Sequence, residues 1–308
     1  MKIRKKEHPA HPGPKPPWLR KRIAAGTTLH RVHDLVKNKG LHTVCQEAHC
    51  PNLGECYGSG TATLMILGDR CTRNCRFCAV TSATPLPPDP QEPEQAARAI
   101  REMALSYAVI TSVTRDDLED GGAGHFAACI REIRQQNPDT RIEVLIPDLR
   151  GDGQALQTVV DAAPEVINHN LETVARLYDE VRPQADYQRS LQVFERLRDI
   201  DPRGVTKSGL MLGLGETAAE IETALGDLHR AGCHILTLGQ YLAPSREHYP
   251  VDRYVTPEEF SAWEEKALEI GFAAVASAPF VRSSYRAGEL YALAAGQMKK
   301  QNESHSEP

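Results

Sequence analysis

The chain has 308 residues, of which 41% are hydrophobic and 25% charged, a composition ordinary for a soluble globular protein of one barrel-sized domain or two smaller ones. No stretch approaches the roughly 20 apolar residues that a membrane-spanning helix needs, and the basic first residues are not followed by the apolar segment of a secretory signal. We therefore expect a soluble, cytoplasmic protein with no membrane partner.

The formal net charge of −5 is unevenly distributed along the chain. Residues 1–22 hold eight basic residues and one acidic residue, a local charge of +7, so the remainder carries −12. Five prolines within residues 8–17 oppose helix and sheet, and residues 1–17 are predicted to form a disordered arm. Such an arm binds nucleic acid or an acidic protein, or is merely solvated. We favour the solvated interpretation and expect no nucleic-acid partner.

Residues 18–62 are predicted to form an amino-terminal extension. A short amphipathic helix is expected at 28–38, with Gly40 as its cap. Cys45, Cys50 and Cys56 follow with the spacing C-x4-C-x5-C. Three thiolates are one short of a set for an iron–sulfur cube, and a zinc site completed by His42 or His49 is equally compatible with this triplet.

From residue 63 onward, short apolar runs alternate with helical patterns. The predicted strands are Thr63–Leu67, Tyr107–Ser112, Arg141–Ile146, Glu165–Asn168, Ser208–Leu212, Ile235–Gly239 and a seventh run at Phe272–Ser277. The helices between them are centred on Ile100, Ile130, Val159, Phe194 and Leu225. This order predicts an α/β fold with a parallel sheet, either a doubly wound open sheet or a complete or partial barrel.

The carboxy-terminal part begins with a strongly marked helix. Thr256 and Glu259 have the spacing of a capping box, and Pro257 suits the first turn. We expect the parallel-sheet domain over residues 63–255, a carboxy-terminal extension over 256–292, and a disordered polar tail over 293–308.

A second cysteine triplet lies directly after the first predicted strand. Cys71, Cys75 and Cys78 have the spacing C-x3-C-x2-C, which supplies three thiolates to a cube of four irons and leaves one iron open. A zinc knuckle is the alternative, although no second C-x2-C pair is present. Six cysteines crowded into residues 45–78 of a large chain favour metal ligation in a reducing compartment over disulfides.

Other candidate groups have structural explanations. Cys129 and Cys233 lie in apolar surroundings and are predicted to be core thiols. Residues 121–124, Gly-Gly-Ala-Gly, lack the lysine of a phosphate-binding loop, so a tight turn is expected.

The two cysteine triplets in this order resemble the lipoyl synthase family of radical S-adenosylmethionine (SAM) enzymes. Further segments are similar to that family: Glu47–Asn52, Val113–Ala123, Asn168–Thr173, Lys207–Glu216, Gln240–Pro244 and Arg282–Tyr285. The resemblance covers about residues 18–290.

The resemblance implies a partial (β/α)6 TIM-type barrel whose extensions carry an auxiliary cluster. It implies sulfur insertion at C6 and C8 of a protein-bound octanoyl-lysine, with two [4Fe-4S] clusters and SAM as cofactors. The expected partners are octanoylated lipoyl carrier domains, such as a 2-oxoacid dehydrogenase E2 subunit or the glycine-cleavage H protein, and an electron donor such as ferredoxin or flavodoxin.

The resemblance also assigns roles to residues. Cys71, Cys75 and Cys78 would hold the cluster that binds SAM; Cys45, Cys50 and Cys56 would hold the auxiliary cluster, with Ser284 as fourth ligand. Residues near the SAM site would be Phe77, Asn170, Glu172, Lys207 and Glu216.

Two alternatives remain at this point. One is another sulfur-inserting enzyme of the superfamily, such as a biotin synthase or a methylthiotransferase. The other is a non-enzymatic electron carrier or zinc-binding module.

Overall fold

The computed structural model describes residues 13–20, 42–43, 50, 52 and 63–304. The predicted helix at 28–38, most of the arm, and Cys45 and Cys56 lie outside the described residues. Within the described part, no helix is long and apolar enough to cross a membrane.

The main sheet has eight strands in the order β1-β2-β5-β6-β7-β8-β9-β10. All neighbours from β2 to β10 run parallel, and β1 is antiparallel to β2. The bounds are β1 His42–Thr43, β2 Thr63–Ile66, β5 Tyr107–Ser112, β6 Arg141–Leu145, β7 Val166–Asn168, β8 Val205–Leu212, β9 Ile235–Gln240 and β10 Ala274–Ser277. All seven predicted strands are confirmed, with shifts of a few residues at their ends. A small parallel pair, β3 (Arg70–Cys71) and β4 (Thr81–Ser82), stands apart.

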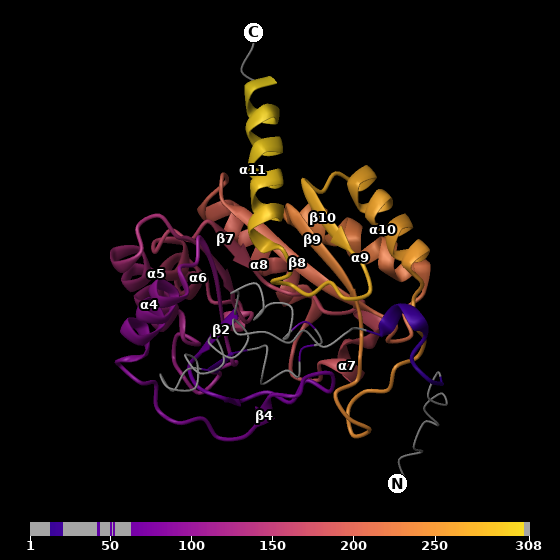
Figure 1. Ribbon diagram of the computed structural model, residues 1–308, viewed down its shortest axis with the longest axis horizontal. Coiled ribbons are helices and arrows are strands. Elements are labelled where there is room, and N and C mark those ends of the chain that lie inside the picture. Colours follow the sequence, from indigo (N-terminus) through magenta and orange to yellow (C-terminus); the bar gives the residue numbers. More distant parts are fainter. Residues whose placement is uncertain (1–12, 21–41, 44–49, 51, 53–62, 305–308) are drawn as a thin grey trace.

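Helices surround the sheet (Figure 1). Their bounds are α4 Glu92–Met103, α5 Ala123–Gln136, α6 Gly153–Val160, α7 Tyr178–Val181, α8 Tyr187–Ile200, α9 Ala218–Ala231, α10 Pro257–Ile270 and α11 Ala287–Ser304, with single 3-10 turns η1 Pro17–Leu19, η2 Leu149–Gly151 and η3 Ala175–Leu177. Among the described strands β10 does not pair with β2, so the barrel is partial, as expected.

Alternation along the strands explains which face carries the core. In β5 and β6, Ala108, Ile110, Ile142 and Val144 are buried in the same cluster as Phe126 of α5. The intervening residues of these strands, such as Glu143, face the barrel interior because side chains alternate across a sheet. Cys129 and Cys233 are buried thiols, which confirms their predicted core role.

Helix ends follow local sequence chemistry. The predicted capping box of α10 is present: the Thr256 hydroxyl accepts from Glu259 N, and the Glu259 carboxylate accepts from Thr256 N. The expected turn is present at Gly121 and Gly122, where Gly122 has φ +96°, and α5 begins directly after it at Ala123. Backbone in this conformation favours glycine because it has no Cβ.

The polar tail predicted from residue 293 is wrong for most of its length, because α11 continues to Ser304. Leu290, Ala294 and Met298 recur at a helical spacing and pack against Ile235 and Ala274. This small apolar stripe needs a partner to fold, and the strands provide it. The parallel sheet also extends past the expected barrel boundary at residue 255, because β10 pairs with β9.

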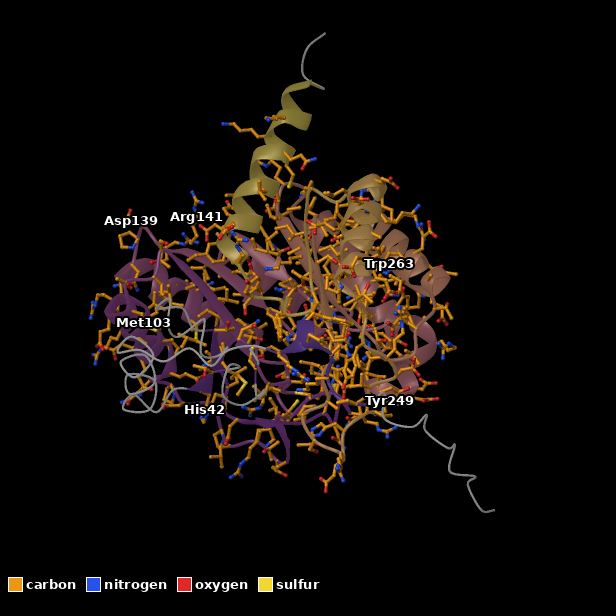
Figure 2. The ribbon with its side chains drawn as sticks, turned by 45° about the vertical axis from the view of Figure 1, so that its right-hand side comes forward. His42, Met103, Asp139, Arg141, Tyr249 and Trp263 are labelled. Atoms are coloured by element: carbon orange, nitrogen blue, oxygen red, sulfur yellow. The ribbon has the colours of Figure 1, made fainter. Side chains whose placement is uncertain are left out.

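Helix α11 covers the amino ends of the strands. The Tyr291 ring of α11 lies 6.2 Å from the Tyr107 ring at the start of β5. The Arg141 guanidinium, at the start of β6, lies 5.3 Å from the centre of the Tyr291 ring. Figure 2 shows Arg141 toward the α11 end and Tyr249 at the opposite end. The carboxyl ends of the strands are therefore the end that α11 leaves uncovered, where barrel proteins build their sites.

Candidate metal centre

Three cysteines of one loop lie together near the carboxyl end of β2. Cys71 ends β3, and Cys75 and Cys78 follow within a turn closed by Cys78 N donating to Cys75 O at 3.0 Å. All three are free thiols and partly buried. Burial raises the pKa of Cys78 to about 12, and the nearby Cys75 and Cys71 add to this effect. Burial also raises the pKa of Cys75, whereas Arg182 opposes the rise. The three sulfurs are thus electrostatic neighbours.

The first half of this loop is tied to the strand ends beside it. Thr72 donates its N–H and its hydroxyl to Thr114 O, at 3.1 and 3.0 Å. The buried Arg73 guanidinium lies between Asp116, which follows β5, and Asp148, which follows β6. The loop is therefore held by two successive βα connections.

The second half is held by the end of α7 and by the segment after β9. Arg76 N donates to Val181 O at 2.8 Å, and Tyr249 N donates to Arg76 O at 2.8 Å. The Arg76 guanidinium lies 5.5 Å from the centre of the Tyr249 ring. Phe77 packs on the second core cluster at this end. It precedes Cys78 in the chain, and its place near a cofactor stays a prediction.

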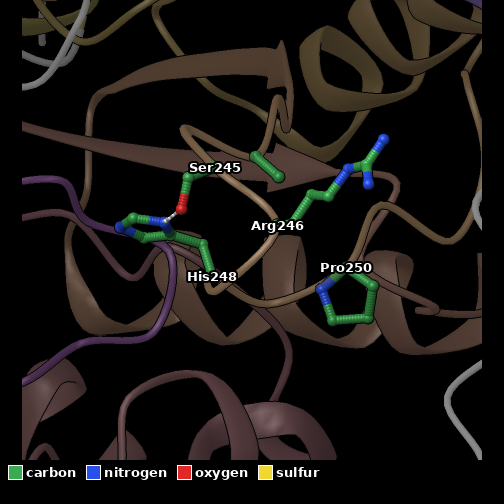
Figure 3. A pocket seen from close by; sticks show the side chains of 5 residues that line it. Ser245, Arg246, His248 and Pro250 are labelled. Atoms are coloured by element: carbon green, nitrogen blue, oxygen red, sulfur yellow. Dashed lines mark hydrogen bonds between the residues drawn. The ribbon is translucent and has the colours of Figure 1, made fainter.

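A pocket of about 400 Å³ lies along the segment after β9 and is lined by Ala243, Ser245, Arg246, His248 and Pro250 (Figure 3). The Ser245 hydroxyl and His248 Nδ1 are 2.8 Å apart. His248 Nε2 lies 3.1 Å from the carbonyl oxygen of Cys78. The pocket wall is thereby connected to the cysteine loop.

Asn170 and Glu172 form a polar cluster after β7. Asn170 Nδ2 donates to Glu172 Oε1 at 3.0 Å and to the Ser283 hydroxyl at 2.7 Å. Burial raises the pKa of Glu172, against the lowering influence of Arg182 and Asn170. Glu172 has φ +68°, which is uncommon for a residue with a side chain and often marks functional segments. The structure thus brings these two predicted residues together with the Arg282–Tyr285 segment.

Arg182 is a further candidate site residue, which the sequence did not reveal. Its Nη1 donates to the carbonyl oxygens of Asn170 and Leu171 at 3.1 Å, and its charge acts on Cys75. In the described structure Arg182 Nε and Asn170 Oδ1 are buried without a hydrogen-bond partner. Buried polar atoms of this kind are normally satisfied, so this donor and acceptor fit a polar ligand. No local spacing connects Arg182 with the cysteines; the only signal was its position before Pro183, after α7.

Two predicted residues have other partners. Lys207 Nζ donates to Glu143 Oε1 at 2.8 Å, and both side chains are completely buried in the sheet. Both carboxylate oxygens of Glu216 accept backbone N–H groups, from Gly213 at 2.6 Å and Leu214 at 2.8 Å. Lys207 is therefore not brought together with the cysteine loop, and Glu216 stabilises its own turn.

One cysteine of the first triplet is described. Burial lowers the pKa of Arg282, and nearby Cys50 and Glu172 oppose this shift. Asn52 Nδ2 donates to Phe280 O at 2.7 Å. The amino-terminal cysteine segment and the Arg282–Tyr285 segment therefore lie side by side at the carboxyl end of the barrel.

The three thiols of the Cys71–Cys78 loop suit a cluster of several irons. Among the described residues, no three His, Cys, Asp or Glu side chains converge to hold one metal ion. A cluster needs no such convergence, because each iron takes its own thiolate. The Arg73 N–H already donates to Cys71 Sγ at 3.4 Å, the kind of contact that iron–sulfur proteins make to their thiolates.

Residues 65–228 match the family model of the Radical SAM superfamily. The chain is 54% identical over 275 residues to lipoyl synthase of Caldicellulosiruptor saccharolyticus, covering 89% of this chain and 96% of that protein. It is 55% identical over 289 residues to lipoyl synthase of Methylococcus capsulatus, covering 94% and 90%.

Solved structures with a similar fold are distant in sequence. Methylornithine synthase aligns with a TM-score of 0.53 at 12% identity, over 68% of this chain and 69% of that one. Streptococcus suis SuiB bound to S-adenosylmethionine aligns with a TM-score of 0.55 at 9% identity, over 70% and 51%. These likenesses support the partial-barrel fold.

Proposed function

The chain belongs to the lipoyl synthase family of the radical SAM superfamily, and from this premise we propose that it inserts sulfur at C6 and C8 of an octanoyl chain carried on a lysine of a lipoyl carrier protein. It is a sulfurtransferase. The observation that carries the proposal is the loop of three neighbouring thiols at the carboxyl end of a partial barrel, with one iron position left without a cysteine.

Cys71, Cys75 and Cys78 fit one [4Fe-4S] cluster, and the amino and carboxylate groups of SAM would occupy its open iron. When bound, the clusters and SAM supply the radical chemistry and the sulfur, which no side chain can provide at an unpolarised C–H bond. The protein has to hold these groups in register and exclude water.

The unpartnered polar atoms suggest where SAM is held. Arg182 Nε is a buried cationic donor beside Cys75, suited to the cofactor carboxylate. Asn170 Oδ1 and the Glu172 carboxylate are acceptors within the same group, suited to hydroxyl or ammonium donors. Lys207 and Glu216 are not part of this proposal, because their polar groups already have buried partners.

We further propose that Cys45, Cys50, Cys56 and Ser284 hold the auxiliary cluster that provides the sulfur. The proximity of Cys50 to Arg282 supports a site between the two segments. Of the two serines, Ser283 is engaged by Asn170 at 2.7 Å, whereas no hydrogen bond of the Ser284 hydroxyl is found among the described residues. The engagement of Ser283 supports Ser284 as the iron ligand.

Substitution of the two serines separates these roles. An alkoxide matches cluster iron less well than thiolate does, so its iron should be the most readily released, as a consumable cluster requires. Ser284→Ala and Ser284→Cys should keep SAM cleavage but lose lipoyl product, whereas Ser283→Ala should retain turnover. Full product from Ser284→Ala would refute the assignment, and loss of product only in Ser283→Ala would move the ligand one residue back.

The carrier and electron donor follow from this chemistry. An octanoylated carrier domain, such as an E2 subunit or the glycine-cleavage H protein, would present the acyl chain at the barrel mouth. A low-potential carrier such as ferredoxin or flavodoxin would supply electrons in the cytoplasm.

The proposed function is tested by anaerobic incubation of the reconstituted chain with reductant, SAM and an octanoyl-lysine peptide, followed by mass spectrometry. Two clusters would give about eight iron per chain. Replacing Cys71, Cys75 and Cys78 together by alanine should leave about half of that iron and abolish 5′-deoxyadenosine formation. Continued 5′-deoxyadenosine formation in this variant would overturn the assignment of the radical cluster. Continued formation of lipoyl product by this triple variant would overturn the proposed function.

A further inference from the structure

Arg73, between two of the cluster cysteines, makes more hydrogen bonds than a simple salt bridge requires. Its Nε and Nη2 donate to Asp116 at 2.7 and 2.8 Å, and its Nη1 and Nη2 donate to Asp148 at 2.8 and 2.7 Å. Two carboxylates thus bind one guanidinium in two bidentate pairs. Such forks fix geometry as well as charge, because the guanidinium is planar and its donors are rigidly placed.

Both carboxylates are themselves fixed. Asp116 N donates to the Thr72 hydroxyl at 3.1 Å, so the residue before Arg73 is bound to the same connection. Asp148 Oδ1 also accepts Arg150 N at 3.1 Å, and its side chain is completely buried. The Arg73 side chain therefore has a rigid counterpart at the ends of β5 and β6.

The backbone of the same residue contacts a cluster ligand. Arg73 N donates to Cys71 Sγ at 3.4 Å. Hydrogen bonds to cluster sulfurs stabilise the more negative, reduced state and so raise the reduction potential. A residue whose side chain is clamped on two sides will hold its own N–H in a constant direction toward that sulfur.

We propose that Arg73 is a positioning residue for the cluster bound by Cys71, Cys75 and Cys78: its grip on Asp116 and Asp148 keeps the Arg73 N–H directed at the Cys71 sulfur. These hydrogen bonds of Arg73 thereby help to retain the cluster and set its reduction potential. This inference rests on the proposed function for the presence of the cluster, and it concerns only how this chain holds it.

Charge and geometry are separated by choice of substitution. Arg73→Lys keeps the positive charge but cannot form two bidentate pairs, whereas Arg73→Gln removes both. Arg70→Gln is the matched control, because Arg70 lies three positions earlier, is half-exposed, and has only Asp69, at 3.9 Å, as an ion-pair partner among the described residues. Asp116→Asn is a milder variant, since the Asp116 side chain is about one-third exposed.

The readouts are iron release to a chelator and the midpoint potential of the SAM-responsive cluster, followed by electron paramagnetic resonance in the reconstituted full chain. Arg73→Lys should release iron about tenfold or more faster than wild type, in line with the usual effect of losing an outer-sphere partner. Its midpoint potential should shift to a more negative value. Arg73→Gln should shift it further, Asp116→Asn less, and Arg70→Gln should match wild type.

Wild-type potential and iron release in Arg73→Lys would overturn the proposal. A midpoint-potential shift in Arg70→Gln equal to that in Arg73→Gln would overturn the proposal too, because the loss of overall charge would then be the cause. Should Arg73→Gln fail to fold, as judged by circular dichroism, Arg73→Lys and Asp116→Asn decide the matter. A wild-type chain that loads the cluster but forms no lipoyl product would refute the proposed function while leaving these measurements valid.

Discussion

Removal of the Lys207 ammonium tests whether this buried residue serves the fold or the cofactor. Lys207 and Glu143 are both completely buried and 2.8 Å apart, and Glu143 also accepts the Tyr107 hydroxyl at 2.8 Å. The substitution Lys207→Met would leave the Glu143 charge buried without its cation. Loss of one partner of such a pair typically costs about 3–5 kcal/mol of unfolding free energy.

Removing both charges should cost far less. Replacement of a buried ion pair by neutral side chains of similar volume is often close to neutral, and the glutamine of Glu143→Gln can still accept from Tyr107. At about 2–4 °C per kcal/mol for domains near this size, Lys207→Met should lower Tm by about 6–20 °C. The double variant should recover most of that loss.

The assay combines thermal unfolding with SAM binding to the reconstituted protein. If Lys207 acts only in the fold, the double variant should bind SAM like wild type. Glu172→Gln provides the contrast, because Glu172 lies in the group proposed to contact SAM and this variant should bind more weakly. A double variant with wild-type Tm that fails to bind SAM would refute the structural role and return Lys207 to the cofactor site.

Three further outcomes are expected. Burial opposes ionisation of Asp148, but the hydrogen bonds and charge of Arg73 prevail and lower the pKa of Asp148 to about 2. The ionised Asp148 therefore stabilises the folded protein fully above the unfolded pKa of about 3.9. This stabilisation is lost as the pH falls toward 2. The stability difference between wild type and Asp148→Asn in denaturant unfolding should therefore shrink from pH 5 to pH 2, and a constant difference would contradict this. Gly239→Ala should destabilise the protein by about 1–3 kcal/mol, because a Cβ there would lie 2.1 Å from Val281 O; an unchanged Tm would show that the 281–284 segment yields freely. Deleting the basic residues 1–17 should slow modification of an acidic whole carrier at low salt but not of a short octanoyl peptide, since exposed charges act over roughly 8–10 Å; equal carrier rates would leave the arm as a solvated tail.

The sequence alone determined the features that depend on neighbouring residues. The β5 strand runs Tyr107–Ser112 as predicted, because its apolar run is bounded by turn residues. The α10 capping box needed only the spacing of Thr256 and Glu259. The C-x3-C-x2-C spacing also predicted a metal-binding loop from the sequence alone, since one short loop contains all three thiols.

The carboxy-terminal helix required the tertiary structure. The apolar stripe of α11 is too narrow to predict a helix by itself, and it folds against Ile235 and Ala274, which lie far from one another in sequence. The prediction of a disordered tail was wrong there because the many polar residues of this segment outweighed the few apolar residues at helical spacing.

Only the tertiary structure decided which polar residues meet. Lys207 pairs with Glu143 inside the sheet, and Arg182, which follows α7, lies near Cys75. Arg73 finds Asp116 and Asp148 because parallel strands bring their carboxyl ends to one edge, however long the helices between them. Periodicity assigns a residue to a strand or its end, but the partner of a buried charge depends on strand order and register, which local sequence does not encode.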